Sequence, residues 1–149
     1  MSPLIFLSAI CLLAIFYSLS VKGVFQRIIT IVLASFFLLR WTGWEWVYIS
    51  SIIVTALCSA TLVIYGIMHK HMNVFTRLSV LLMGVFFSLS LIVRVQHYIG
   101  ESVFTYLPAI PIALFMIGYF TSKSGRPKEF SFMMIFISMS VLDIVQLLQ

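Results

Sequence analysis

Charged residues are scarce in this chain: they make up 9% of its 149 residues, and only four of them are acidic. A soluble domain carries roughly 25% charged residues, so this chain has too few charges to cover a surface that faces water. The long apolar runs also lack the alternation of polar and apolar residues that marks the strands of a membrane barrel. We therefore expect an all-α, polytopic membrane protein built as a helical bundle.

Residues that carry chemistry are also few. The two cysteines, Cys11 and Cys58, have no C-x-x-C partner and lie in apolar runs, so we interpret them as core residues and not as a redox pair. Two histidines lie in Met68–Met72, but no carboxylate or thiolate accompanies them, which favours a solvated turn over a metal site. No hydrolase triad, zinc motif or phosphate-binding glycine loop is present. We expect a protein without enzymatic activity, cofactor or metal.

Six apolar segments approach the roughly 20 residues that a helix needs to cross a bilayer. The sequence predicts a single transmembrane domain over residues 1–149, with spans at residues 3–20, 24–41, 46–68, 75–95, 102–120 and 130–148. The second segment is the shortest in apolar length, because Gln26, Arg27 and Arg40 interrupt it. A re-entrant second segment with five crossings is the alternative.

The positive charges favour six crossings. Most of the nine Lys and Arg residues lie in alternate connections, at Lys22, Arg27, Lys70, Arg77, Lys123, Arg126 and Lys128. Cytoplasmic loops are enriched in Lys and Arg, so six crossings would place both termini on the non-cytoplasmic side, as suits a bacterial inner membrane. The net charge of +5 then reflects topology. It predicts no nucleic-acid partner, because the chain has no basic patch with interleaved aromatic residues.

Two arginines, Arg40 and Arg94, lie on the opposite side, each before an aromatic turn with a glycine and a glutamate. The aromatic side chains are Trp41, Trp44 and Trp46 in the first turn, and His97 and Tyr98 in the second. The arginines are 54 positions apart, which suggests a parallel duplication of a hairpin, roughly residues 24–68 and 75–121. Because Trp, Tyr and Arg favour the headgroup layer, the turns are either interfacial anchors or a contact surface for a partner or lipid.

The second turn, Arg94-Val95-Gln96-His97-Tyr98-Ile99-Gly100, resembles the hairpin turn of the gliding-motility motor membrane proteins of Bacteroidota and their small membrane relatives. In that family the turn is typically a Lys, two residues and then His-Trp-Pro-Gly. The first turn of this chain, Arg40-Trp41-Thr42-Gly43-Trp44, resembles a degraded copy of the same pattern. The resemblance covers about half of the chain and implies a membrane hairpin whose turn is not cytoplasmic. The motor members carry an acidic residue within the hairpin helices, which the predicted spans two to five lack.

Asp143 is the one acid well inside a predicted span, and the sequence predicts that it forms an intramembrane charge pair with Arg40 or Arg94, at the same depth. Interfacial solvation and a proton relay are the alternatives. Pro108 and Pro111 predict a kink in the fifth span, because each removes a donor to the carbonyl four residues earlier. Small residues, at Ser51, Thr55, Ser59, Gly84, Ser88 and Ser90, predict close helix packing.

Together these patterns favour a subunit or interaction partner within a larger membrane complex, with lipids and other integral membrane proteins as its partners. A homo-oligomer is compatible with the sequence. The first alternative is a small transporter or ion or proton channel that uses Asp143 and the kinked fifth helix. A lipid-modifying enzyme is a weaker alternative, because the histidines and acids do not cluster.

Overall fold

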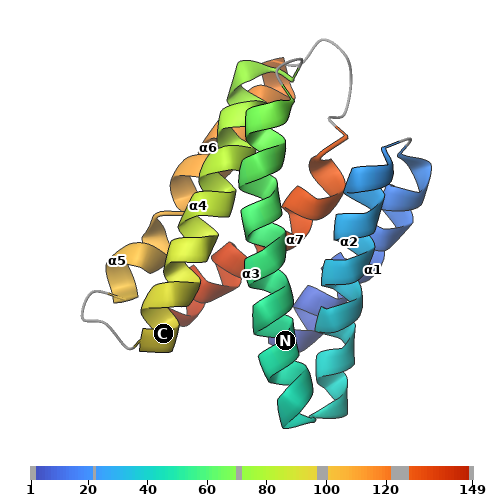
Figure 1. Cartoon of the computed structure of the whole chain (residues 1–149), viewed down its shortest axis with the longest axis vertical. Helices are drawn as coiled ribbons and strands as arrows, with labels where there is room; N and C mark the ends of the chain where they lie inside the picture. The colour runs from blue at the N-terminus through green and yellow to red at the C-terminus, as the bar shows by residue number, and fades with distance from the viewer. Residues whose placement is uncertain (1–2, 22, 70–71, 97–100, 122–127, 148–149) are drawn as a thin grey trace. The chain divides into compact units, whose positions relative to one another are not determined.

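The computed structural model describes residues 3–21, 23–69, 72–96, 101–121 and 128–147, and all the regular structure in these ranges is helical. The elements are α1 (Pro3–Ser20), α2 (Val24–Leu39), the 3-10 turn η1 (Arg40–Thr42), α3 (Glu45–Met68), α4 (Val74–Gln96), α5 (Glu101–Tyr106), α6 (Ala109–Thr121) and α7 (Phe130–Leu147) (Figure 1). The predicted all-α class is confirmed. The helix ends fall close to the predicted ones because Gly, Pro and basic residues separate the apolar runs.

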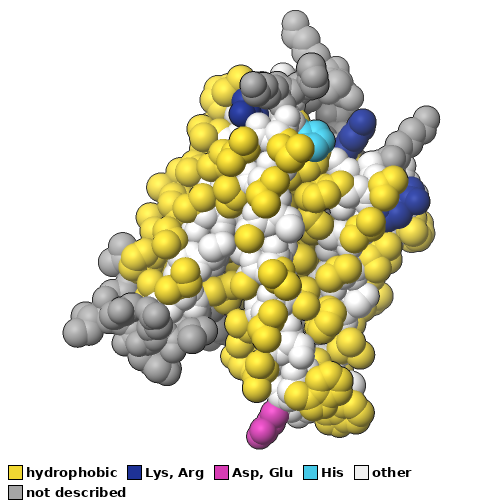
Figure 2. All heavy atoms as spheres, in the orientation of Figure 1, with side chains coloured by type: hydrophobic (Ala, Val, Ile, Leu, Met, Phe, Trp, Pro, Cys, Tyr) yellow, Lys and Arg dark blue, Asp and Glu magenta, His cyan; other side chains and the backbone are white. Residues whose placement is uncertain are grey.

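Four helical segments are long and apolar enough to cross a membrane, namely Val24–Thr42, Glu45–Met68, Val74–Val93 and Phe104–Thr121. Two further apolar helices, α1 and α7, are shorter over the described residues. Hydrophobic side chains cover most of the face drawn in Figure 2. Many large hydrophobic side chains are exposed along the helices, up to 78% at Phe16 and 75% at Phe120, and so large an exposed apolar surface is typical of contact with lipid. The chain therefore has the surface of an integral membrane protein.

The fifth predicted span is interrupted where the sequence predicts a kink. It is broken at Leu107 and Pro108 into α5 and α6. The carbonyl of Phe104, which Pro108 deprives of its helical donor, accepts instead from Ser90 Oγ of α4 at 3.2 Å. The Leu107 carbonyl accepts from the Ile110 amide at 3.1 Å. Serine donors of a neighbouring helix make such a break tolerable in an apolar environment, and propensity alone could not predict them.

The chain divides into two compact units, Met1–Thr55 with Lys128–Leu142, and Ala56–Pro127 with Asp143–Gln149. The divisions fall inside α3 and α7. In the first unit α1 packs along α2 (Figure 1). The buried hydroxyl of Thr30 on α2 donates to Ser131 Oγ on α7 at 3.0 Å, so α7 completes this unit. In the second unit α4 packs against α6, and Ser79 Oγ of α4 donates to the Pro111 carbonyl at 2.7 Å.

Small residues bring α3 and α4 together within the second unit, as the sequence predicts. A side chain at Gly84 would place its Cβ 2.6 Å from the Ser59 carbonyl oxygen and 2.8 Å from Val63 Cγ2. Ser59 Oγ and Ser88 Oγ lie 2.9 Å apart and share a hydrogen bond across the same contact. The two backbones approach this closely because no Cβ stands between them.

Helices α2 and α4 bury equivalent positions when they are compared fifty residues apart. The buried residues are Gln26, Ile29, Thr30, Leu33, Ala34 and Phe37 in α2, and Thr76, Ser79, Val80, Met83, Gly84 and Phe87 in α4. The predicted register of 54 residues, which pairs Arg40 with Arg94, matches four of these six buried positions and not all six, because four extra residues rotate a helix face by about 40°. In the register of the structure, Arg40 corresponds to Ser90.

Candidate functional site

The turn between α2 and α3 reverses the chain in the five residues 40–44. After the 3-10 turn, Gly43 takes the left-handed conformation at φ 70°, and its amide donates to the Arg40 carbonyl at 3.2 Å. A residue with a Cβ is disfavoured in this conformation. Thr42 Oγ1 donates to the Leu39 carbonyl at 2.8 Å and satisfies the end of α2. Glu45 then opens α3, where a carboxylate is favoured by the helix dipole.

Arg40 is held by aromatic rings on both helices. Its guanidinium carbon lies 4.8 Å from the ring centre of Tyr48 and 5.6 Å from that of Phe37. Such cation–π contacts orient the guanidinium through its face. The N–H donors lie in the guanidinium plane, so stacking leaves them available for an acceptor. Within the described part of the chain, no hydrogen bond or ion pair of this guanidinium is observed.

All three tryptophans of the chain lie in this turn, and the structure brings them to its surface. Trp41, Trp44 and Trp46 are 55%, 59% and 62% exposed. The Trp41 indole nitrogen donates to Ser8 Oγ of α1 at 2.6 Å, which ties the turn to the first helix. The rings of Trp44 and Trp46 lie 5.7 Å apart. Whether these side chains form a contact surface, as the sequence predicts, stays a prediction.

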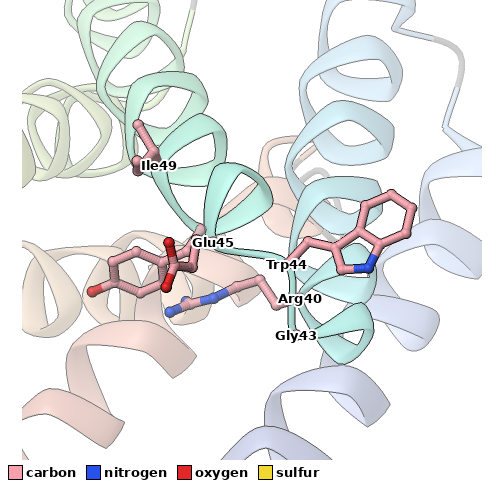
Figure 3. A pocket seen from close by; sticks show the side chains of 6 residues that line it. Arg40, Gly43, Trp44, Glu45 and Ile49 are labelled. Atoms are coloured by element: carbon pink, nitrogen blue, oxygen red, sulfur yellow. The ribbon is translucent and has the colours of Figure 1, made fainter.

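A hollow of about 510 Å³ opens beside the turn, lined by Arg40, Gly43, Trp44, Glu45, Tyr48 and Ile49. The side chains of Arg40 and Glu45 extend on one side of the turn, and Trp44 extends on the other (Figure 3). The hollow therefore exposes a cation and an anion side by side. Neither charge has an ion-pair partner within 4.0 Å among the described residues.

The second predicted turn cannot be compared with the first. His97 and Tyr98 lie outside the described residues, as does the side chain of Arg94. Asp143 is half-buried on α7 and has an interaction with another residue. The predicted charge pair with Arg40 or Arg94 stays a prediction, because Arg40 belongs to the other compact unit and the Arg94 side chain lies outside the described residues.

The predicted kink residues Pro108 and Pro111 are both buried. The Ser79 hydroxyl donates a hydrogen bond to the carbonyl of Pro111, and α4 packs against α6. This packing favours a structural role for the two prolines over the lining of a transport path.

Two arginines have a role that sequence reasoning missed. Arg27 Nη2 donates to the Val21 carbonyl at 2.9 Å. Arg77 donates from Nε to the Gly66 carbonyl at 2.7 Å and from Nη2 to the Ile67 carbonyl at 3.2 Å. Each arginine thus caps the C-terminal end of the preceding helix, where carbonyls lack helical donors and a cation is favoured. The repeated pattern Val-Phe-x-Arg, which begins both α2 and α4, is the signal that reveals this role.

Comparison of the chain with models of protein families, with curated proteins and with solved structures finds no match. The resemblance of Arg94–Gly100 to the motor hairpin stays a prediction, since most of that turn lies outside the described residues. Within the described ranges, no group of three or more His, Cys, Asp or Glu side chains is placed to hold a metal ion. The turn between α2 and α3 is therefore the site on which a function can be argued.

Proposed function

We propose that this chain is a non-enzymatic subunit of a larger membrane assembly, and that the turn between α2 and α3 contacts another integral membrane protein. One observation carries the proposal: the only tryptophans of the chain gather in one turn at the end of two spanning helices, and each is more than half exposed. Tryptophan, tyrosine and arginine are enriched at the energetic centres of protein interfaces, and this turn presents all three types.

The arrangement of the aromatic rings supports a contact surface. Trp41 is used within the chain, since it bonds to Ser8. Trp44, at the end of the turn, and Trp46, in the first turn of α3, form a tilted pair of rings. Rigid aromatic side chains lose little conformational freedom on binding, so a preformed pair is well suited to fit a pocket of a partner. An interfacial anchor without a partner is the competing explanation, because indoles also favour the headgroup layer.

The proposal includes six crossings, with the basic connections on the cytoplasmic side. Helices α1 and α7 have 18 residues each, which lies within the range of roughly 17–25 for a transmembrane helix. Arg27 and Arg77 lie at the start of the second helix of their hairpins and cap the first, as expected where a helix pair meets a headgroup layer. The turn with Arg40 would then lie on the opposite side of the membrane.

Site-specific photocrosslinking in cells that naturally produce the chain tests the proposal. Trp46 is replaced by a benzophenone amino acid, and Leu57, on the same helix and equally exposed at 62%, is the matched control in mid-span. We expect a protein adduct at Trp46, identified by mass spectrometry, and none at Leu57. An adduct with a second copy of the chain would identify the partner as a homo-oligomer. Absence of any protein adduct at Trp46, in a membrane fraction where the chain is intact, would contradict the proposal and support an anchor.

A further inference from the structure

The hollow beside the turn between α2 and α3 holds two opposite charges that do not neutralise each other. Arg40 and Glu45 both line it, yet they do not form an ion pair within 4.0 Å. We propose that this hollow binds a phosphoethanolamine headgroup, with its phosphate on Arg40 and its ammonium on Glu45. The inference goes beyond the proposed function and does not depend on a protein partner.

The cationic half of the site is preorganised. Phe37 and Tyr48 hold the guanidinium of Arg40 through its π face. The in-plane N–H groups form a fork whose spacing matches two oxygens of a phosphate. Because the rings already fix the side chain, little conformational entropy is lost when the phosphate binds. A lysine would supply the charge without the fork.

The anionic half gives the site its selectivity. Glu45 extends from the first turn of α3 toward the same side of the turn as Arg40 (Figure 3). A primary ammonium brings three N–H donors to its carboxylate. A phosphoglycerol headgroup has no cation, so Glu45 would only repel its phosphate. A choline headgroup has a cation but no N–H donor. The expected order of affinity is phosphoethanolamine, then phosphocholine, then phosphoglycerol.

The place and size of the hollow fit a lipid headgroup. The volume of about 510 Å³ lies within the roughly 300–1,000 Å³ of small-molecule sites. The hollow opens at the junction of two segments that can cross a membrane, Val24–Thr42 and Glu45–Met68. Tryptophan favours the headgroup layer of a membrane, and Trp44 lines the hollow. The headgroup of a phospholipid would therefore reach the site while its acyl chains stay in the bilayer.

Native mass spectrometry of the full chain in maltoside detergent tests the inference. The probes are dihexanoyl phosphatidylethanolamine, phosphatidylcholine and phosphatidylglycerol, together with soluble glycerophosphoethanolamine and inorganic phosphate. We expect phosphatidylethanolamine to bind about tenfold more tightly than phosphatidylglycerol, because only its ammonium makes a charge-assisted contact with Glu45. Arg40→Gln should weaken all three lipids about tenfold. Lys128→Gln, which removes an exposed charge outside the hollow, should leave all affinities unchanged.

Glu45→Gln removes the charge and keeps the shape of the side chain. It is therefore the decisive variant, and its result can be interpreted even if Arg40→Gln disturbs the structure of the turn. It should abolish the preference for phosphatidylethanolamine over phosphatidylglycerol. Binding of glycerophosphoethanolamine as tight as that of the lipid would support the same site with a soluble ligand. Equal or tighter binding of phosphatidylglycerol by the parent would overturn the inference, as would a preference that Glu45→Gln does not change. The crosslinking experiment at Trp46 tests the proposed protein partner and not the lipid site. A negative result in one experiment therefore does not contradict the other proposal.

Discussion

Removal of the Arg77 guanidinium should destabilise the hairpin of α3 and α4. Arg77 is half-buried and donates to the carbonyls of Gly66 at 2.7 Å and Ile67 at 3.2 Å. A hydrogen bond from a charged donor contributes about 1.5–3 kcal/mol when it is shielded from water. The bond to Ile67 is long and exposed, so we count mainly the bond to Gly66. Arg77→Ala should therefore lower the free energy of unfolding by about 2 kcal/mol.

Thermal unfolding of the purified chain in maltoside, followed by circular dichroism, measures this effect. A loss of about 2 kcal/mol corresponds to a fall in Tm of roughly 4–8 °C for a chain of this length. Arg77→Lys keeps the charge but lacks the planar guanidinium from which Nε and Nη2 bond the two carbonyls, so it should recover less than half of the loss. Arg27→Ala should cost less than Arg77→Ala, because Arg27 Nε is buried without a hydrogen-bond partner. A Tm for Arg77→Ala within 1 °C of the parent would refute the capping role.

Two further substitutions probe the packing of α3 against α4 and the half-buried acid Asp143. Gly84→Ala should cost about 1–3 kcal/mol by overpacking, because the new Cβ would lie 2.6 Å from the Ser59 backbone oxygen; the same thermal assay checks this, and an unchanged Tm would contradict the close approach. Asp143→Asn should lower the Tm if the acid pairs with Arg94, one of its two predicted partners, and the double variant with Arg94→Gln should then be no less stable than Asp143→Asn alone. Additive losses in this cycle would exclude that pair.

The sequence predicted the helix limits well, and the reason is physical. Hydropathy decides which segments avoid water. Gly23 and Asn73 directly precede α2 and α4, and each separates its helix from the preceding apolar segment. The backbone amides of Arg27 and Arg77 bond to those two residues, at 3.1 Å and 2.8 Å. The exposed tryptophan turn was also predictable, because it contains every tryptophan of the chain.

Other features depend on contacts between helices and were not predicted. The break at Pro108 forms because Ser90 of another helix satisfies the freed carbonyl. The buried positions that recur fifty residues apart in α2 and α4 depend on which faces pack, and the conspicuous arginines do not reveal them, since Arg40 lies beyond the matching stretch. The hollow at Arg40 requires the side chains of Phe37 and Tyr48 to converge from two helices.

The central claim is that α3 crosses a membrane and separates the tryptophan turn from the basic connections. Single cysteines at Thr42 and His69, both exposed at opposite ends of α3, test it in a background where the buried Cys11 and Cys58 are replaced by alanine. A membrane-impermeant maleimide is added to intact cells. We expect labelling at position 42 at once and at position 69 only after permeabilisation. Equal labelling at both positions in intact cells would contradict the account.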